Sequence, residues 1–311
     1  MKQRGPLPEV KPTPHHPDEL KPGHLRFAAT RLDEAVAAHR DAEYAPPELL
    51  TLTNRQLALV EHYFDRFASI AAAYELTAEQ AAGRIEEGFY LLDADRLDPP
   101  PELLLTLLDE IVALADFTDE ETKRILAGFA ADLQARPEEL RRLVRLNIAR
   151  DPTLIESEAA AADLPTGAYW FVARNLAAAT LTPFGARLAP LVDDERWRRN
   201  RCPVCGNEPA LAALAGDGGR RHLYCDTCGM VWTFDRLACP FCDHRKQEDL
   251  RVLVVDDQSP HRLDACEHCH RYLKTVDYRK IEENRAALLP IEDAATLYLD
   301  LMADRDGYHR D

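Results

Sequence analysis

The sequence predicts a multidomain protein of the α + small β class: an N-terminal all-helical bundle, two tandem four-cysteine modules and a C-terminal helix. Three observations lead to this prediction. Apolar residues recur every three or four positions over the first part of the chain, as on one face of a helix. All eight cysteines then fall into four Cys-x-x-Cys pairs between Cys202 and Cys269. Beyond them, LPIEDAATLYLDLMADRDGY again has helical periodicity.

The chain of 311 residues is long enough to contain several domains. Its first residues are rich in Pro, Lys and His, which is typical of a flexible tail. A change of composition at DDERWRRNRCP marks the boundary before the cysteines. The predicted parts are a tail at 1–25, a helical domain at 26–195, four-cysteine modules at 196–236 and 237–280, and a C-terminal helix at 281–311 that packs back onto the rest.

Helix starts in the first half are predicted from caps and prolines. We expect about six to eight helices packed into one bundle. Capping boxes are predicted at Thr53 with Gln56, Thr77 with Gln80, and Thr118 with Glu121. The prolines at 99–101, 137 and 152 fall where helices should begin or end.

The most apolar segment runs from Tyr169 to Val192. Arg174, Pro183 and Arg187 interrupt it, so it does not reach the about 18 to 20 apolar residues of a membrane span. We expect a central core helix here. The alternative is a helix that presents a groove to a partner protein.

Composition excludes several classes of function. With 38 basic and 54 acidic residues the formal net charge is -16, which disfavours binding to nucleic acid. The N-terminal residues contain no apolar stretch like that of a secretory signal, so we expect a cytoplasmic protein without membrane insertion.

In a reducing compartment, Cys-x-x-Cys pairs indicate metal ligands or redox centres rather than structural disulfides. The sequence does not fix an oligomeric state.

The spacing of the cysteines predicts two metal sites. The first two pairs form C-x2-C-x19-C-x2-C and the last two form C-x2-C-x23-C-x2-C. Two such turns can surround one ion with a tetrahedron of thiolates, in a small rubredoxin-like or zinc-ribbon module. Zinc and iron both accept four thiolates, so spacing does not choose between them. Sequential pairing of the turns is simplest, and an interleaved arrangement stays open.

The residues between the cysteines predict β-hairpins. PALAAL and RHLY flank the turn AGDGGR in the first module, and MVWTF follows as a further strand. DLRVLVVDD, RLDA and RYLKTVDY repeat this plan in the second module. Gly206 and Gly229 follow the second cysteine of their pairs and free the backbone there, whereas Asp243 and His270 stand at the equivalent positions. Five histidines near the cysteines exceed the ligand count and are expected at the surface: His222, His244, His261, His268 and His270.

No catalytic constellation is evident, so we expect a protein that is not an enzyme. The alternative is a rubredoxin-like electron carrier or a thiol-redox protein, which needs iron or a thiol pair of depressed pKa. A zinc-ribbon nucleic-acid binder is disfavoured, because such modules need a basic face.

Three stretches resemble a known family. RHLYCDTCGMVWTFDRLACPFC, ACEHCHRYLKT and EDAATLYLDLMADRDGY are similar to the formate dehydrogenase accessory protein FdhE family, over roughly residues 165–311. The resemblance implies a cytoplasmic protein that is not itself a formate dehydrogenase. It implies binding to the catalytic subunit of a respiratory formate dehydrogenase and support of its maturation before export.

The resemblance also implies rubredoxin-like iron binding, so iron is favoured and zinc stays possible. Carried over, one metal site consists of Cys202, Cys205, Cys225 and Cys228, and the other of Cys239, Cys242, Cys266 and Cys269. Five further residues lie in the matching stretches, and we expect them to serve packing rather than partner contact: Trp232, Arg236, Tyr272, Lys274 and Asp293.

Overall fold

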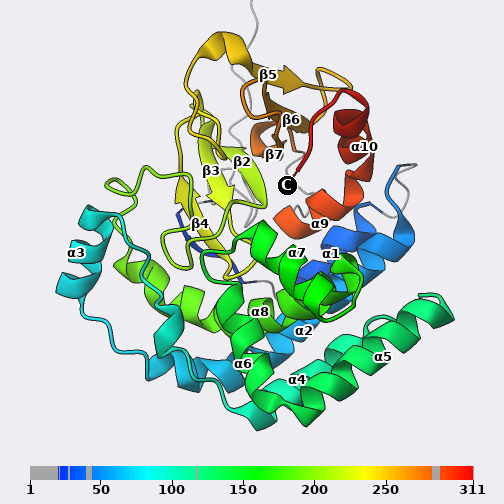
Figure 1. Cartoon of the computed structure of the whole chain (residues 1–311). Helices are drawn as coiled ribbons and strands as arrows, with labels where there is room; N and C mark the ends of the chain where they lie inside the picture. The colour runs from blue at the N-terminus through cyan, green and yellow to red at the C-terminus, as the bar shows by residue number, and fades with distance from the viewer. Residues whose placement is uncertain are drawn as a thin grey trace, which may run out of the picture.

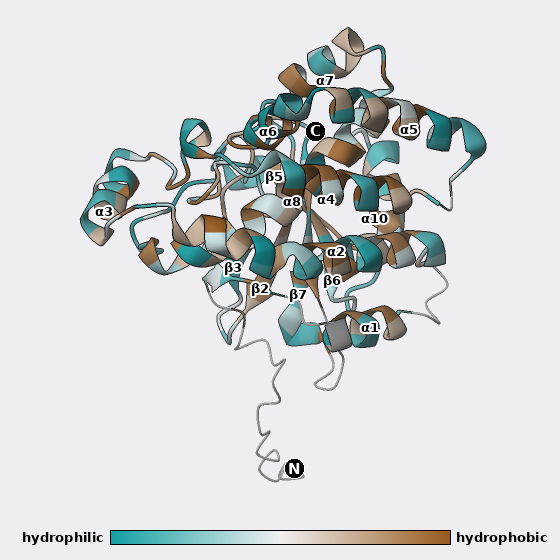
Figure 2. Cartoon of the chain, turned by 90° about the horizontal axis from the view of Figure 1, so that it is seen from below, coloured by the Kyte–Doolittle hydropathy of each residue, from teal (hydrophilic) through white to brown (hydrophobic). Residues whose placement is uncertain are grey.

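The computed structural model describes residues 20, 22–26, 29–39, 44–116, 118–281 and 288–310. Most of the predicted tail therefore lies outside the described residues. The helical part and the sheet lie side by side, with the last helices against both (Figure 1). Hydrophobic segments concentrate in the middle of the molecule, on α8 and α4 and along the central strands (Figure 2).

The first half is helical, as predicted. Its helices are α1 (Ala29–Ala37), α2 (Pro47–Ala72), α3 (Ala78–Glu87), α4 (Pro101–Ala113), α5 (Glu120–Ala135), α6 (Pro137–Leu146), α7 (Pro152–Ala161) and α8 (Thr166–Leu188). Prolines begin α2, α4, α6 and α7, because a first-turn residue needs no intrahelical N–H partner.

One of the three predicted capping boxes is confirmed. Thr77 and Gln80 exchange hydrogen bonds of 3.0 and 3.1 Å at the start of α3. The box at Thr53 is wrong, because α2 starts at Pro47 and runs through it. The box predicted at Thr118 with Glu121 is also wrong, because the cap of α5 is the next residue, Asp119, which accepts from the N–H of Thr122 at 2.8 Å.

Helix α8 is the central core helix that the sequence predicts. Most of its residues are buried, and α2 packs along it. Pro183 lies inside the helix without ending it. Gly185 lets the helix approach the four-cysteine region, since a Cβ there would lie 1.9 Å from the carbonyl oxygen of Cys228.

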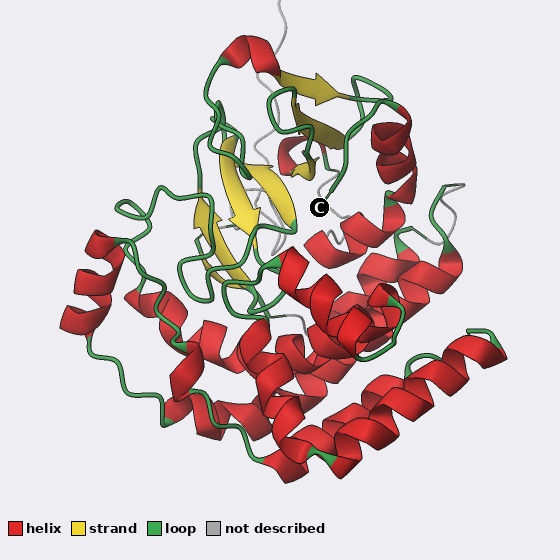
Figure 3. Ribbon diagram, in the orientation of Figure 1, coloured by secondary structure: helices red, strands yellow, loops and turns green. Residues whose placement is uncertain are grey.

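The strands of both predicted modules join in one sheet (Figure 3). The sheet consists of β2 (Leu211–Ala215), β3 (Arg220–Tyr224), β4 (Met230–Thr233), β5 (Leu250–Leu253), β6 (His261–Cys266) and β7 (Tyr272–Asp277) from the modules and of the short strand β1 (Gly23–His24), which lies in the segment predicted as a tail. The strand order is β1-β4-β3-β2-β7-β6-β5. The hairpins follow the prediction. The parallel pair β2–β7, with Ala213 opposite Val276, joins the modules.

The chain ends in two helices where the sequence predicts one. They are α9 (Leu289–Ala295) and α10 (Leu297–Arg305), divided at Thr296. The break has a physical cause, because Lys274 donates from Nζ to the carbonyl oxygens of Asp293 and Thr296, at 2.8 and 3.5 Å. Among the described residues, no helix has the length and apolar character needed to cross a membrane.

Candidate metal centres

Four sulfurs meet in the first module. Sγ of Cys202 lies 3.5 Å from Sγ of Cys228, and Sγ of Cys205 lies 3.5 Å from Sγ of Cys225. All four sulfurs lie within 4.8 Å of one another, and all four residues are fully buried. The structure thus groups the first two pairs sequentially. We refer to these four cysteines as the inner centre.

The second module holds a similar group. Sγ of Cys239 lies 3.7 Å from Sγ of Cys269, and Sγ of Cys242 lies 3.9 Å from Sγ of Cys266. Cys239 and Cys266 are buried, whereas Cys242 is exposed and Cys269 is partly exposed. We refer to these four cysteines as the outer centre, because solvent reaches two of its sulfur-bearing residues.

The same backbone turn forms all four Cys-x-x-Cys pairs. In each, the residue after the second cysteine donates its N–H to the carbonyl of the first, at 2.8 to 3.0 Å. That residue has a positive φ in every case: Gly206 at 78°, Gly229 at 72°, Asp243 at 56° and His270 at 55°. The glycines predicted to free the backbone do so, and the outer centre makes the turn with side chains that rarely adopt this conformation.

The sulfur positions fit a tetrahedral ion. A metal–sulfur bond of about 2.3 Å requires sulfur–sulfur edges of about 3.8 Å in a tetrahedron. Two sulfur pairs in each centre, at 3.5 to 3.9 Å, match this edge. Each centre could therefore hold one metal ion in four-thiolate coordination.

Electrostatics also favour an ion at the inner centre. Burial raises the pKa of the Cys205 and Cys228 thiols well above the usual value. Burial also acts on Cys225, but hydrogen bonds from the other three cysteines outweigh it and hold the pKa of Cys225 well below the usual value, so one thiolate shares its charge with neighbouring thiols. Thiolates at this depth therefore need a cation beside them. The outer centre differs. Burial raises the pKa of the Cys242 thiol, but hydrogen bonds from the backbone of His244 and the side chain of His268 outweigh burial and lower this pKa to about 7.

The helical part supports the inner centre directly. The N–H groups of Leu91 and Leu92 donate to the carbonyls of Pro203 and Val204, each at 2.9 Å. The N–H of Ala149 donates to the carbonyl of Cys205 at 2.8 Å. The first cysteine turn is therefore bound to two loops of the helical part.

Sequence reasoning missed Asn207, which is buried next to the first turn. Its Nδ2 donates to the carbonyl of Asn147 at 2.7 Å and to Oγ1 of Thr227 at 2.9 Å. Its Oδ1 accepts from the N–H of Arg150 at 2.9 Å. Asn207 thus joins both inner turns to the helical part. The only signal in the sequence is its place directly after Cys-Gly.

Of the five residues predicted to serve packing, four are buried or partly buried and one is exposed. Trp232, Tyr272 and Lys274 are buried, and Asp293 is partly buried beneath Arg310. Arg236 is exposed, and its Nη1 donates to the carbonyl of Gly218 at 3.2 Å. Packing is therefore confirmed for all but Arg236.

The histidines near the cysteines are not all at the surface. His268 and His270 are exposed, and His244 is partly buried with its ring stacked on that of His268 at 4.6 Å. The prediction is wrong for His222 and His261, which are buried. His261 lies beside the fully buried carboxylate of Glu292 in α9, so the C-terminal helices cover it.

The fold and the two centres define a class of protein: a helical bundle joined to a sheet that carries two four-cysteine sites. The family model described as FdhE, central domain, matches residues 201–236. "Protein FdhE homolog" of Aquifex aeolicus is 30% identical over 119 residues, 37% of this chain and 41% of the relative. The homologue of Pseudomonas putida is 35% identical over 121 residues, 35% of this chain and 36% of the relative.

"Protein FdhE" of Escherichia coli is 29% identical over 140 residues, 42% of this chain and 44% of the relative. These matches span less than half the length of the curated relatives. The crystal structure of the FdhE protein from Pseudomonas aeruginosa shares the fold, with a TM-score of 0.61 at 19% identity over 93% of this chain and 96% of that one. The resemblance to the FdhE family that the sequence predicts is confirmed.

Proposed function

We propose that this chain is a cytoplasmic accessory protein that binds the catalytic subunit of a respiratory formate dehydrogenase and supports its maturation before export. It acts as a binding factor and not as an enzyme. The observation that carries the proposal is the pair of four-sulfur centres within a fold shared with FdhE. Iron is the favoured metal and zinc the alternative.

The two centres have different tasks in this proposal. The inner centre fixes the first module to the helical part, because its turns are bound to loops of the bundle. The outer centre lies at the surface, with Cys242 exposed. When iron is bound, a four-thiolate site supplies one-electron chemistry, and the chain's own residues set how far solvent reaches it.

A pulldown tests the partner. Tagged full-length chain is co-expressed with the formate dehydrogenase catalytic subunit, and the retained subunit is quantified against a tag-only control. We expect retention well above that control, and retention lost when Cys202 and Cys205 are both changed to serine. Retention no higher than the tag-only background, with wild-type chain that carries its metal, contradicts the proposal.

A second function is favoured by the exposure of the outer centre: a rubredoxin-like electron carrier or thiol-redox protein. Electron transfer requires iron, so the zinc-substituted protein distinguishes the two. Full support of formate dehydrogenase maturation by the zinc form removes the electron-carrier function. Loss of that support, with subunit binding intact, favours it.

A further inference from the structure

A cavity of about 240 Å³ lies where all parts of the chain meet. Arg150, Trp170 and Arg174 line it from the helical part. The first module contributes Glu208 and Asp226, the second contributes Phe241 and Arg271, and the C-terminal segment contributes Asp293 and Arg310. A ligand in this cavity would touch the helical bundle and both modules at once.

The charges of the lining do not balance. Three carboxylates each have an arginine partner: Glu208 with Arg271 at 2.8 Å, Asp226 with Arg174 at 2.7 Å, and Asp293 with Arg310 at 3.0 Å. Arg150 is a fourth arginine in the same lining. The cavity therefore has one positive charge in excess, in a chain whose formal net charge is -16.

Arg150 carries this excess charge. Its guanidinium carbon lies 4.4 Å from the ring centroid of Trp170, which holds it by a cation–π contact. Its side chain makes no ion pair or hydrogen bond with the residues that the structure describes, although, against the opposing effect of burial, its charge acts with those of Arg271 and Arg201 to lower the pKa of Glu208. A guanidinium has five N–H donors, so Arg150 has N–H groups available to a ligand in the cavity that it lines.

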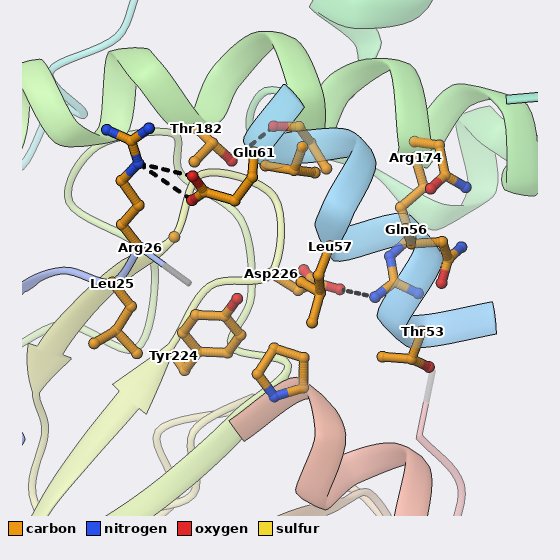
Figure 4. Close-up of a pocket in the computed structure, with 15 residues that line it drawn as sticks. Leu25, Arg26, Thr53, Gln56, Leu57, Glu61, Arg174, Thr182, Tyr224 and Asp226 are labelled. Atoms are coloured by element: carbon orange, nitrogen blue, oxygen red, sulfur yellow. Dashed lines mark hydrogen bonds and ion pairs between the residues drawn. The ribbon is translucent and has the colours of Figure 1, made fainter. Parts of the chain in front are cut away.

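Arg174 adds a second set of donors. It lies one turn after Trp170 on α8 and therefore on the same face. Figure 4 shows its ion pair with Asp226 at the edge of a neighbouring, mostly apolar cavity of about 70 Å³. The Arg174 side chain is 44% exposed, so donors remain beyond the contact with Asp226.

We propose that this cavity binds a carboxylate group, held by Arg150 and Arg174. An arginine fork matches a carboxylate in bidentate geometry. A single excess charge is neutralised by one monoanionic group, whereas a dianion such as phosphate would leave the lining with a net negative charge in a chain whose formal net charge is already -16. The inference rests on the proposed function in one respect: the carboxylate is supplied by an acidic side chain of the partner protein.

The test uses the metal-loaded, full-length chain and two probes. The first is a dansyl-labelled, C-terminally amidated peptide of Gly, Asp and Glu, compared with the same peptide carrying Asn and Gln, which contains no carboxylate, with binding followed by fluorescence anisotropy. The second is free glutarate, followed by calorimetry. The variants are Arg150→Gln and Arg174→Gln. The matched control is Arg124→Gln on α5, whose side chain is 77% exposed.

We expect the acidic peptide to bind the wild type and the control equally, and to bind Arg150→Gln at least about tenfold more weakly, which corresponds to about 1.4 kcal/mol. Binding should weaken with added salt. If glutarate binds with the same dependence on Arg150, the site accepts free carboxylates as well. If only the peptide binds, the site is specific for a protein carboxylate.

Equal affinity for acidic and neutral peptides, or equal affinity of Arg150→Gln and wild type, overturns the proposal. The proposal is also overturned if neither the acidic peptide nor glutarate binds the wild-type chain. Circular dichroism and metal content show that each variant is folded. The outcome is separate from that of the pulldown: a chain that retains the catalytic subunit equally well with and without Arg150 refutes the carboxylate site while the proposed function stands.

Discussion

Lys274 of β7 places its Nζ 2.6 Å from Oδ2 of Asp300 in α10. The same ammonium lies 2.8 Å from Oδ1 of Asp293 in α9, and the Lys274 side chain is 3% exposed. One buried cation therefore holds both C-terminal helices against the sheet. Arg310 completes the group by pairing with Asp293 at 3.0 Å.

Replacing Lys274 with Met should destabilise the protein by about 3 to 5 kcal/mol, because two carboxylates lose a buried partner. The free energy of unfolding in urea measures this loss. Lys123→Met is the control, since the pair of Lys123 with Glu120 is exposed and its removal should cost less than about 1 kcal/mol. Similar losses in the two variants would show that the buried cation does not hold the helices.

The acid stability of the C-terminal group should follow Asp293. Burial raises the pKa of Asp293, but the positive charges of Arg310 and Lys274 outweigh burial and lower this pKa from 3.8 to about 2. A carboxyl whose pKa is lower in the folded state than in the unfolded state stabilises the folded protein. This stabilisation is complete at pH values above the pKa of the unfolded state, and it is lost as the pH falls to the pKa of the folded state. The stability due to Asp293 should therefore disappear between about pH 4 and pH 2, and amounts to about 2 kcal/mol.

Urea unfolding of wild type and Asp293→Asn at several pH values measures this effect. The difference in free energy of unfolding between them should shrink by about 2 kcal/mol from pH 5 to pH 2. Metal loss in acid affects both proteins and does not enter the difference. A difference that stays constant over this range would contradict the lowered pKa.

The outer centre should release its metal before the inner one. Cys242 is exposed, whereas every cysteine of the inner centre is buried. With a chelator in excess, we expect two phases of metal release, each of one equivalent, with the faster phase at least about tenfold quicker because a chelator reaches the exposed centre without unfolding.

Single serine variants assign the phases. Cys242→Ser should remove the fast phase and leave the slow one. Cys205→Ser should remove the slow phase, with elemental analysis confirming one remaining equivalent. Two equivalents released in a single phase by the wild type would show that both centres open together.

Backbone strain in the outer centre can be relieved. His270 is exposed and has a φ of 55°. Because glycine adopts this conformation without strain, His270→Gly should stabilise the protein by about 0.5 to 1 kcal/mol, measured by urea unfolding.

Gly229→Ala is the opposite test at an equivalent turn. Its Cβ would lie 2.8 Å from Nε2 of His24 and 3.0 Å from the carbonyl oxygen of Leu25, with φ at 72°. We expect a loss of about 1 to 3 kcal/mol, from strain and from displacement of β1. Stability unchanged in both variants would argue against strain at this position of the turn.

Local patterns predicted local structure well. Prolines marked the starts of α4, α6 and α7, and turn residues between apolar runs marked the hairpins. Identical Cys-x-x-Cys spacing indicated the four-sulfur groups, because two such turns suffice for one tetrahedron. These features depend on residues close together in the chain, so a short window of sequence contains the whole signal.

Long-range features were not predicted, for a physical reason. The parallel pairing of Ala213 with Val276 depends on register between distant strands, which no local pattern specifies. The break at Thr296 depends on Lys274, more than twenty residues earlier. The role of Asn207 requires Asn147 and Thr227 to be adjacent in space. Each signal exists only once the chain is folded.

The small strand β1 has a consequence for synthesis of the protein. Its residues Gly23 and His24 pair with Val231 and Met230 of β4, about two hundred residues later. A ribosome that makes about 5 to 20 residues per second needs at least about ten seconds between the two strands. During that interval β4 does not yet exist, so β1 pairs with it only after the first four cysteines have been synthesised.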